Sequence, residues 1–177
     1  MKKEIKYLKK LNLGCEDKIL PRFINVDIDN HEGVDLVYDL EKYPLPFKED
    51  SIEYILCSHV LEHLNNPTKF LFELHRICKK EATIDLFVPH FSCFATYADF
   101  THKHPGFSYF SLGENWTNKQ LYKKFKVQKK LNFTRTNFKF LNKIFNPFIN
   151  LFPTVYERFF CYLLPCSEVK FRLKVIK

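Results

Sequence analysis

Residues 10–28 read KLNLGCEDKILPRFINVDI, two short apolar runs that each lead into a small or acidic residue. The first run stops at Gly14, and the second alternates apolar and polar residues from Arg22 to Asp27 before Ile28. Alternation with a period of two residues indicates a β-strand. Both runs therefore predict strands. Because the chain between them is shorter than an ordinary helical crossover, we expect this connection to form a single helical turn or no helix.

The same alternation continues along the first 90 residues. Further strands are predicted at residues 34–39, 51–58 and 83–89. A helix is predicted between the last two strands, because Asn66 and Pro67 suit its start, apolar residues recur at helical spacing, and the basic Lys79 and Lys80 suit its end. Strands that alternate with helices or short crossovers predict a parallel sheet covered on both faces.

The last third of the chain differs from the rest in charge. Residues 118–177 contain 14 Lys and Arg against two Asp and Glu, whereas residues 1–117 contain 14 against 18, and the whole chain carries +8. Two more strands are predicted at 125–133 and 168–176. We expect one domain, 1–177, whose basic, aromatic part from 118 onward completes the sheet. Such a basic segment suits an anionic partner, but a solvated surface explains it equally well.

Cysteine usage and hydropathy indicate in which cellular compartment the protein is expected. The six cysteines form no Cys-x-x-Cys pair, and several lie in apolar runs, so a zinc ribbon or redox motif is not expected. This cysteine usage fits a reducing cytoplasm. The first residues lack the apolar core of a signal peptide, and no run of 18 uncharged apolar residues occurs. We therefore expect a cytoplasmic protein without a membrane span.

Polar residues gather where the predicted strands end, which is where ligands of open α/β sheets bind. These ends carry Asn12-Leu13-Gly14-Cys15, Asp27, Asp39, Ser58-His59 and Pro89-His90. Acidic residues at successive strand ends suit a hydroxyl-rich ligand such as a ribose. Gly14, one of only four glycines, stands where backbone must approach a ligand closely. A turn glycine and two loop-capping aspartates are the ordinary alternative, and the joint placement of these residues favours a site.

These segments resemble, in order and spacing, class I S-adenosylmethionine-dependent methyltransferases, most closely the small type-11-like group. The resemblance covers roughly residues 9–105 and is carried by LNLGC (11–15), NVDI (25–28), DL (39–40), PLPF (44–47), DSIEYI (50–55) and SHVLEH (58–63). It implies S-adenosylmethionine as the cofactor and residues 1–117 as the cofactor-binding core. It also implies a Rossmann-like sheet, mostly parallel with an antiparallel last strand, in a three-layer αβα arrangement.

The resemblance implies roles for individual residues along the same strand ends. The residues that it places at the cofactor are Asn12, Gly14, Cys15, Asp27, Ile28, Asp39, Leu40, Ser58 and His59. The first three would form the loop around the methionine part of the cofactor. Asp27 would hold the ribose hydroxyls, and Ile28 would touch the adenine beside the Asp-Leu pair of the third strand. The last two residues would line the methyl-transfer side.

The sequence departs from the family pattern in three places. Glu16 and Lys18 stand where the first loop usually repeats glycine, and Lys80-Glu81-Ala82 replaces a Pro-Gly-Gly before the fifth strand. The connection between the first two strands spans only residues 15–22. These departures motivate an alternative, a non-catalytic binding or scaffold protein that keeps the methyltransferase fold.

Histidines supply the candidate bases. Transfer of a methyl group to a hydroxyl needs a positioned acceptor and removal of a proton, and imidazole titrates near neutrality. His102 is our first candidate for the base, and His63 and His90 are the next candidates. The alternative is that these histidines are surface loop residues. His59 and His63 have a spacing that suits a metal ion, but the third ligand is open among His90, His102 and His104. We therefore expect no metal site.

The acceptor is constrained by two motifs that are missing. No Asn/Asp-Pro-Pro-aromatic tetrapeptide follows the fourth strand, and Pro165-Cys166 is misplaced for a cysteine nucleophile. Both absences favour a small-molecule or glycan acceptor over a nucleic-acid base. RNA methylation stays a third hypothesis because of the basic C-terminal part, although that part lacks an ordered base-stacking motif.

Residues 144–166 are apolar and aromatic, and Glu157 and Arg158 are their only charged residues. One interpretation is a segment that docks on an anionic membrane, with flanking basic residues adding attraction, which would suit a lipid-linked acceptor at the inner membrane surface. The alternative is that this segment packs over the sheet or forms a homodimer contact.

Overall fold

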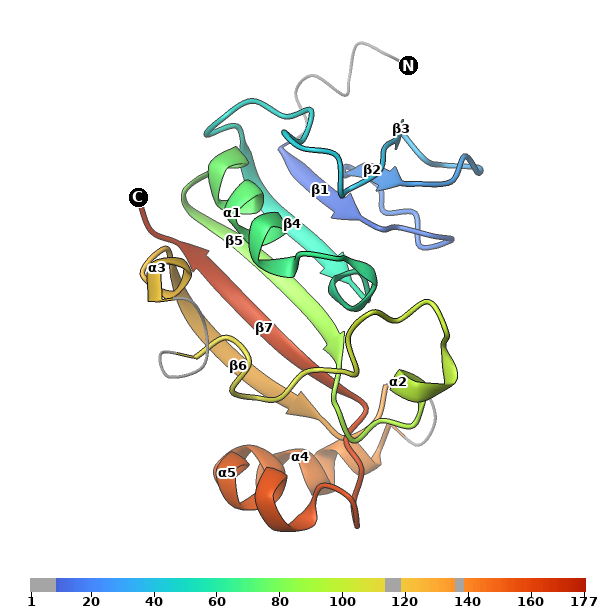
Figure 1. Cartoon of the computed structure of the whole chain (residues 1–177), viewed down its shortest axis with the longest axis vertical. Helices are drawn as coiled ribbons and strands as arrows, with labels where there is room; N and C mark the ends of the chain where they lie inside the picture. Colours follow the sequence, from blue (N-terminus) through green and yellow to red (C-terminus); the bar gives the residue numbers. More distant parts are fainter. Residues whose placement is uncertain (1–8, 114–118, 136–138) are drawn as a thin grey trace.

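Seven strands form one sheet in the order β3-β2-β1-β4-β5-β7-β6 (Figure 1). The computed structural model describes residues 9–113, 119–135 and 139–177, so the first residues, expected to carry no signal peptide, lie outside it. The strands are β1 (Lys10–Leu13), β2 (Ile24–Asp27), β3 (Leu36–Val37), β4 (Ile52–Ser58), β5 (Cys78–Pro89), β6 (Phe125–Asn132) and β7 (Glu168–Val175). Only the two pairings of β7 are antiparallel among these strands. The predicted Rossmann-like, mostly parallel sheet with an antiparallel last strand is confirmed.

Helices occupy the connections that follow β4. They are the 3-10 turn η2 (Leu61–His63), α1 (Pro67–Ile77), α2 (Ala95–Ala98), α3 (Lys119–Tyr122), α4 (Leu141–Leu151), α5 (Pro153–Val155) and the π-helical turn η3 (Tyr156–Phe160). The connection between β1 and β2 contains turns and no helix, as its length predicts.

Helix α1 begins as its sequence predicts. The Asn66 side chain accepts a hydrogen bond of 2.9 Å from the backbone N–H of Lys69, and Pro67 is the first helical residue. The end of α1 was predicted too late. Cys78 already pairs with Ile52 at the start of β4, so the following lysines belong to β5 rather than to the helix terminus.

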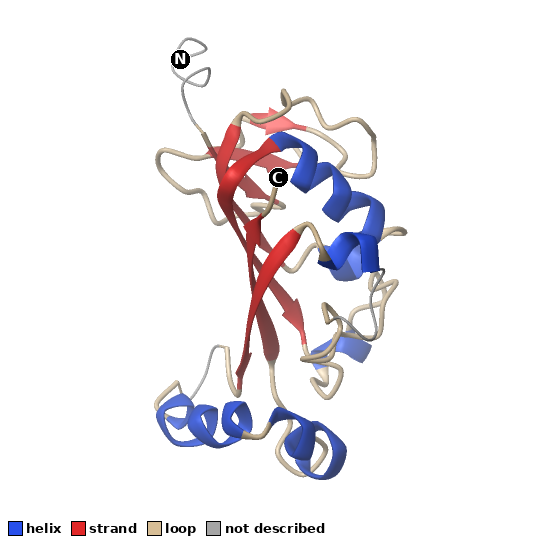
Figure 2. Ribbon diagram, turned by 90° about the vertical axis from the view of Figure 1, so that its left-hand side faces the viewer, coloured by secondary structure: helices blue, strands red, loops and turns tan. Residues whose placement is uncertain are grey.

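The hydrophobic core lies between α1, α3 and one face of the sheet. Ile84 and Leu86 on β5 and Phe171 and Leu173 on β7 point to this face and are at most 1 % exposed. Figure 2 shows the upper helices on one side of the sheet. In the described part of the chain, loops take the place of helices on the opposite face, because the connections around β2 are short. The structure therefore has one helical layer here, where we expected two.

The segment between β6 and β7 forms a separate helical end of the molecule. Helices α4 and α5 lie beyond the ends of these strands, on the side where β5 also ends (Figures 1 and 2). Within the described ranges, no helix combines the length and the apolar character that crossing a bilayer demands.

Candidate functional site

A cavity of about 1100 Å³ opens at the carboxyl ends of β1, β4 and β5. It is lined by Asn12, Gly14 and Cys15 at the end of β1 and by Ser58 and His59 at the end of β4. Residues between 93 and 102, together with Arg135 and Glu168, complete the lining. This volume accommodates a nucleoside-sized ligand together with a second molecule. Of the strand ends predicted to form a site, those of β1, β4 and β5 border this cavity through Gly14, Ser58 and Pro89, whereas Asp27 and Asp39 do not line it.

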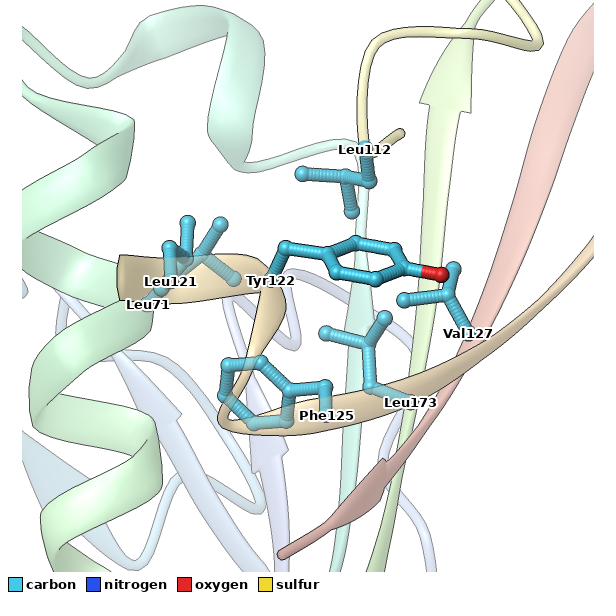
Figure 3. Close-up of a pocket in the computed structure, with 7 residues that line it drawn as sticks. All are labelled: Leu71, Leu112, Leu121, Tyr122, Phe125, Val127 and Leu173. Atoms are coloured by element: carbon cyan, nitrogen blue, oxygen red, sulfur yellow. The ribbon is translucent and has the colours of Figure 1, made fainter. Parts of the chain in front are cut away.

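A second cavity lies inside the core and is too small for a ligand. It measures about 10 Å³, which leaves room for one water molecule at most. Figure 3 shows its lining, in which Leu71, Leu121, Tyr122, Phe125, Val127 and Leu173 converge with Leu112. This cavity is part of the packing between α1, α3 and the sheet.

Gly14 shapes the first loop of the large cavity. Its φ is +63°, and a Cβ at this position would stand 2.3 Å from Cγ2 of Val60, so both backbone and space require glycine. Glu16, which departs from the family pattern, also has a positive φ of 44°. The Glu16 backbone N–H donates a 2.7 Å hydrogen bond to Asp27 Oδ2. The loop therefore keeps a glycine-like backbone although its side chain has changed.

Asp27 lies at the carboxyl end of β2 but is covered. It is 7 % exposed, and its Oδ1 accepts a 3.2 Å hydrogen bond from the backbone N–H of Asp29. The His31 ring contacts the Glu16 carbonyl, and ligand atoms of Cys15, Asp27 and His31 lie within 4.8 Å of one another. His31 thus lies close to Asp27, which is not among the residues that line the cavity. Neighbouring Ile28 is 63 % exposed.

Three other residues expected at the cofactor make structural contacts. The Asn12 amide donates to the Lys18 carbonyl at 2.8 Å and to Asn25 Oδ1 at 3.0 Å, which fastens the connection between β1 and β2. Asp39 accepts from the backbone N–H of Glu41 at 2.9 Å and caps the following turn. Leu40 is buried in the core. Asp39 and Leu40 do not line the cavity, whereas Asn12 does.

His59 joins two carboxylates at the floor of the cavity. Its Nδ1 lies 3.0 Å from Glu62 Oε1, and its Nε2 lies 3.3 Å from Glu168 Oε2. Burial disfavours the charged ring, but hydrogen bonds to Glu168 and Glu62 outweigh it and raise the pKa of His59. Burial likewise opposes ionisation of Glu168, yet hydrogen bonds from His59 and Asn132 hold its pKa below the usual value. The raised pKa of His59 and the lowered pKa of Glu168 both favour an ion pair between these two side chains.

Glu62 is a site residue that the sequence analysis did not select. Its carboxylate is fully buried at 0 % exposure and borders the cavity, and its Oε2 has no hydrogen-bond partner among the described residues. Burying a carboxylate oxygen without a partner is costly. The sequence signal was its position between His59 and His63, the two histidines whose spacing suits a metal ion. Glu168, which also borders the cavity, was missed because its partner His59 lies 109 residues away.

The three candidate bases separate into two groups. His63 and His102 line the cavity, and their ring centroids are 4.7 Å apart. His90 is 0 % exposed, does not line the cavity, and contacts Ser92 Oγ at 2.8 Å and Glu157 Oε1 at 3.1 Å. We therefore do not retain His90 as a catalytic candidate.

Comparisons with known proteins agree with this architecture. Residues 19–84 match the family model described as a methyltransferase domain. A search of curated protein sequences finds no significant match. The structure is similar to a SAM-dependent methyltransferase from Archaeoglobus fulgidus, with 20% identity, a TM-score of 0.60, and coverage of 98% of this chain and 90% of that one. It is also similar to the YcgJ protein from Bacillus subtilis, with 15% identity, a TM-score of 0.60, and coverage of 98% and 94%.

A third similar structure was solved with a ligand. The plantazolicin methyltransferase BpumL in complex with SAH shares 15% identity at a TM-score of 0.51, with coverage of 95% of this chain and 76% of that one. These likenesses show the fold. The resemblance expected from the sequence is thus confirmed: the chain has the class I methyltransferase fold, and a methyltransferase-domain signature spans 19–84.

Proposed function

We propose that this chain, which has the class I methyltransferase fold, is an S-adenosylmethionine-dependent methyltransferase that acts on a small-molecule or glycan acceptor. The observation that carries this proposal is the cavity of about 1100 Å³ at the carboxyl ends of β1 and β4, bordered by Gly14 and Ser58. The matched methyltransferase-domain signature supports it. When bound, the cofactor supplies a methyl group on a positively charged sulfur.

The residues present fit this cofactor. Gly14 lets the backbone turn at the edge of the cavity without a side chain. Asp27 uses its carboxylate oxygens for two backbone N–H groups, and a carboxylate has about four acceptor sites, so it retains capacity for ribose hydroxyls. Exposed Ile28 offers an apolar contact for the adenine. His31 has to move away from Asp27 for the ribose to reach it.

Two histidines of the cavity lining fit a role in holding the acceptor. His63 and His102 line the cavity together with Ser58 and His59. Orientation of the acceptor accounts for much of the rate gain in a displacement of this kind.

Isothermal titration of the whole chain with S-adenosylhomocysteine tests the proposal. We expect saturable binding of one equivalent. Asp27→Asn is expected to weaken it about tenfold or more, because a hydrogen bond to a charged group contributes ~1.5–3 kcal/mol. Asp29→Asn, an exposed neighbour, is the matched control and should leave the affinity unchanged. Ile28→Ala provides a second variant at an exposed position in case Asp27→Asn fails to fold.

One observation favours the alternative of a non-catalytic scaffold with this fold. Asp27 is only 7 % exposed, lies beside His31 and does not line the cavity, so its carboxylate is not open to a ribose in the structure. If the folded wild type binds neither S-adenosylmethionine nor S-adenosylhomocysteine, the scaffold interpretation replaces the enzyme. If binding is present and His31→Ala strengthens it, His31 makes a displaceable loop contact and the enzyme interpretation stands.

The acceptor proposal extends to a peripheral contact with an anionic membrane at the cytoplasmic side. Large apolar side chains are exposed along the helical end: Phe140, Ile144, Phe148, Leu151, Phe152, Val155, Phe159, Phe160, Tyr162, Leu163 and Leu164. The acidic Glu157 in this segment is turned inward, onto His90, Ser108 and Tyr109. The charges left at the surface are Lys139, Lys143 and Arg158. An apolar surface with only basic charges complements anionic lipid.

A further inference from the structure

Three side chains converge on one point of the cavity wall. Glu62 and His63 belong to η2 after β4, and His102 belongs to the loop after α2, 40 residues further on. All three line the cavity. One potential ligand atom from each lies within 4.8 Å of the others. The fold therefore brings a carboxylate and two imidazoles together from two segments.

Hydrogen bonds fix the proton of His63. Thr101 Oγ1 donates to Asp99 Oδ1 at 2.6 Å, because the carboxylate can only accept. The same hydroxyl oxygen lies 3.0 Å from His63 Nδ1, so it accepts a proton from that nitrogen. His63 thus carries its proton on Nδ1. Its Nε2 keeps a free lone pair.

The backbone holds His102 in the same tautomer. Its Nδ1 lies 3.0 Å from the Thr96 carbonyl oxygen, which can only accept, so Nδ1 is the donor. Its Nε2 again keeps a lone pair, with Asp99 Oδ2 3.7 Å away. A ring that donates through one nitrogen to an oxygen and leaves the other nitrogen free is the arrangement found in metal-binding histidines.

Glu62 provides an independent indication of a missing partner. Its Oε1 contacts His59 Nδ1 at 3.0 Å, whereas Oε2 is buried and has no hydrogen-bond partner in the residues that the structure describes. A cation bound through Oε2 would give this oxygen a partner. Without one, a fully buried carboxylate oxygen is left unsolvated.

We propose that Glu62, His63 and His102 bind a divalent transition-metal ion of the zinc class, with one coordination position open toward the cavity. Two imidazoles and one carboxylate match the donor set of zinc sites that keep an exchangeable position. Imidazole ligands favour zinc and its neighbours over magnesium or calcium. Metal–ligand bonds of about 2.0–2.1 Å would draw the three side chains slightly inward.

The role of the ion rests on the proposed function, whereas its binding does not. The open position would hold the acceptor hydroxyl oxygen and lower the pKa of that hydroxyl. The oxygen–carbon bond then forms as the carbon–sulfur bond breaks, the sulfur is left as a neutral thioether, and the hydroxyl proton leaves to water in the cavity. His63 and His102 act here as ligands rather than as bases.

A second cluster, Cys15, Asp27 and His31, also has the spacing of a metal site. Both Asp27 oxygens already accept backbone hydrogen bonds, and the His31 ring contacts the Glu16 carbonyl. In contrast to Glu62, these side-chain oxygens have partners. This cluster serves as the internal control.

Metal binding by the whole chain tests the proposal directly. Protein freed of metal with a chelator is titrated with Zn²⁺ against a competing dye, and with Co²⁺ by visible absorption, which reports the coordination geometry. We expect one equivalent of each ion in the wild type. Glu62→Gln, His63→Gln and His102→Gln should each abolish the high-affinity equivalent. Thr101→Val, which removes the acceptor that orients His63, should weaken Zn²⁺ binding roughly 10–100-fold.

The control variants are His31→Gln and His75→Gln, at histidines outside the cavity lining. Both should bind Zn²⁺ as the wild type does.

Three results would overturn the assignment. The first is that folded wild-type protein binds no equivalent of metal tightly. The second is that tight metal binding survives each of the three ligand substitutions. The third is that His31→Gln loses metal binding. Circular dichroism of each variant distinguishes loss of a metal ligand from loss of folding. Thr101 is exposed and is not itself a ligand, so Thr101→Val still tests the proposal if a ligand variant unfolds. Because S-adenosylhomocysteine binding is measured separately, failure of the metal site leaves the cofactor proposal intact and distinguishable.

Discussion

At the scale of single residues, Gly14 is the position at which the site depends most directly on the backbone. The substitution Gly14→Ala places a left-handed conformation on a residue with a Cβ and sets that Cβ against Val60. We expect the free energy of unfolding to fall by at least about 1–2 kcal/mol. Urea denaturation measures it.

A second substitution separates the two causes. Val60→Ala in the Gly14→Ala background relieves the contact but not the backbone cost, so it should recover only part of the lost stability. A Gly14→Ala variant as stable as the wild type would show that the first loop does not have the described conformation.

The sequence predicts which residues border the cavity where position along a strand is enough. Gly14, Ser58 and His59 border it because each lies at the carboxyl end of a strand or directly after it. The importance of Glu62 could not be predicted, because an unpartnered oxygen is a property of the packed surroundings rather than of the motif. His90 also follows a strand, but its partner Glu157 lies 67 residues away, and no local pattern reveals that contact.

At the scale of secondary-structure elements, an ion-pair cluster on the face opposite α1 links β4, β5 and β7. Asp85 is 2 % exposed and accepts from Arg172 at 2.7 and 2.8 Å and from the Tyr54 hydroxyl at 2.9 Å, with Lys170 at 3.2 Å. Burial opposes ionisation of Asp85, but hydrogen bonds from Arg172, Tyr54 and Lys170 outweigh it and lower its pKa below 3.8. The cluster therefore stabilises the sheet through an ionised carboxylate.

This cluster predicts an acid-sensitive contribution to stability. Because the folded pKa of Asp85 is lowered, its contribution is fully present above the unfolded value of about 3.8 and is lost as the pH falls through the folded pKa. Asp85→Asn should cost about 1–3 kcal/mol near neutrality and show a shallower loss of stability in acid. Chemical denaturation at several pH values compares the two proteins. Parallel pH profiles would contradict the assignment of the acid-sensitive group to Asp85.

Elements were predictable where the signal is local. The strands and α1 follow from alternation, helical spacing and the Asn66 cap, all contained in short windows. The end of α1 was wrong because pairing of Cys78 with Ile52 is non-local and extends β5 backward. The second helical layer is missing because the connections before and after β2 are short. The sequence analysis recognised this only for the connection between β1 and β2.

At the scale of the whole molecule, the exposed apolar side chains of α4, α5 and the turn after them predict membrane association. We expect the wild type to sediment with liposomes that contain anionic lipid at low salt and to be released in part at high salt, because screening weakens the basic contribution. Phe148→Glu and Phe159→Glu together should reduce sedimentation strongly. Val37→Glu, at an exposed position on the opposite edge strand β3, is the matched control.

Failure to sediment would assign this surface differently. If the wild type stays in the supernatant at low salt and forms dimers that Phe148→Glu dissociates, the helical end is a contact between copies. The position of this segment follows from the chain order, since it joins β6 to β7 at the end of the sheet where the cavity opens. A membrane contact there would bring a lipid-linked acceptor close to the site.

The central claim, that the strand-end cavity binds S-adenosylmethionine, is tested most directly by a crystal structure of the whole chain with S-adenosylhomocysteine. We predict the ligand in this cavity, with its ribose hydroxyls on the Asp27 carboxylate, its adenine beside Ile28 and its sulfur toward Ser58, and with His31 displaced. A cavity that stays empty at saturating ligand, or a ligand bound on another face while His31 still lies beside Asp27, would contradict the account.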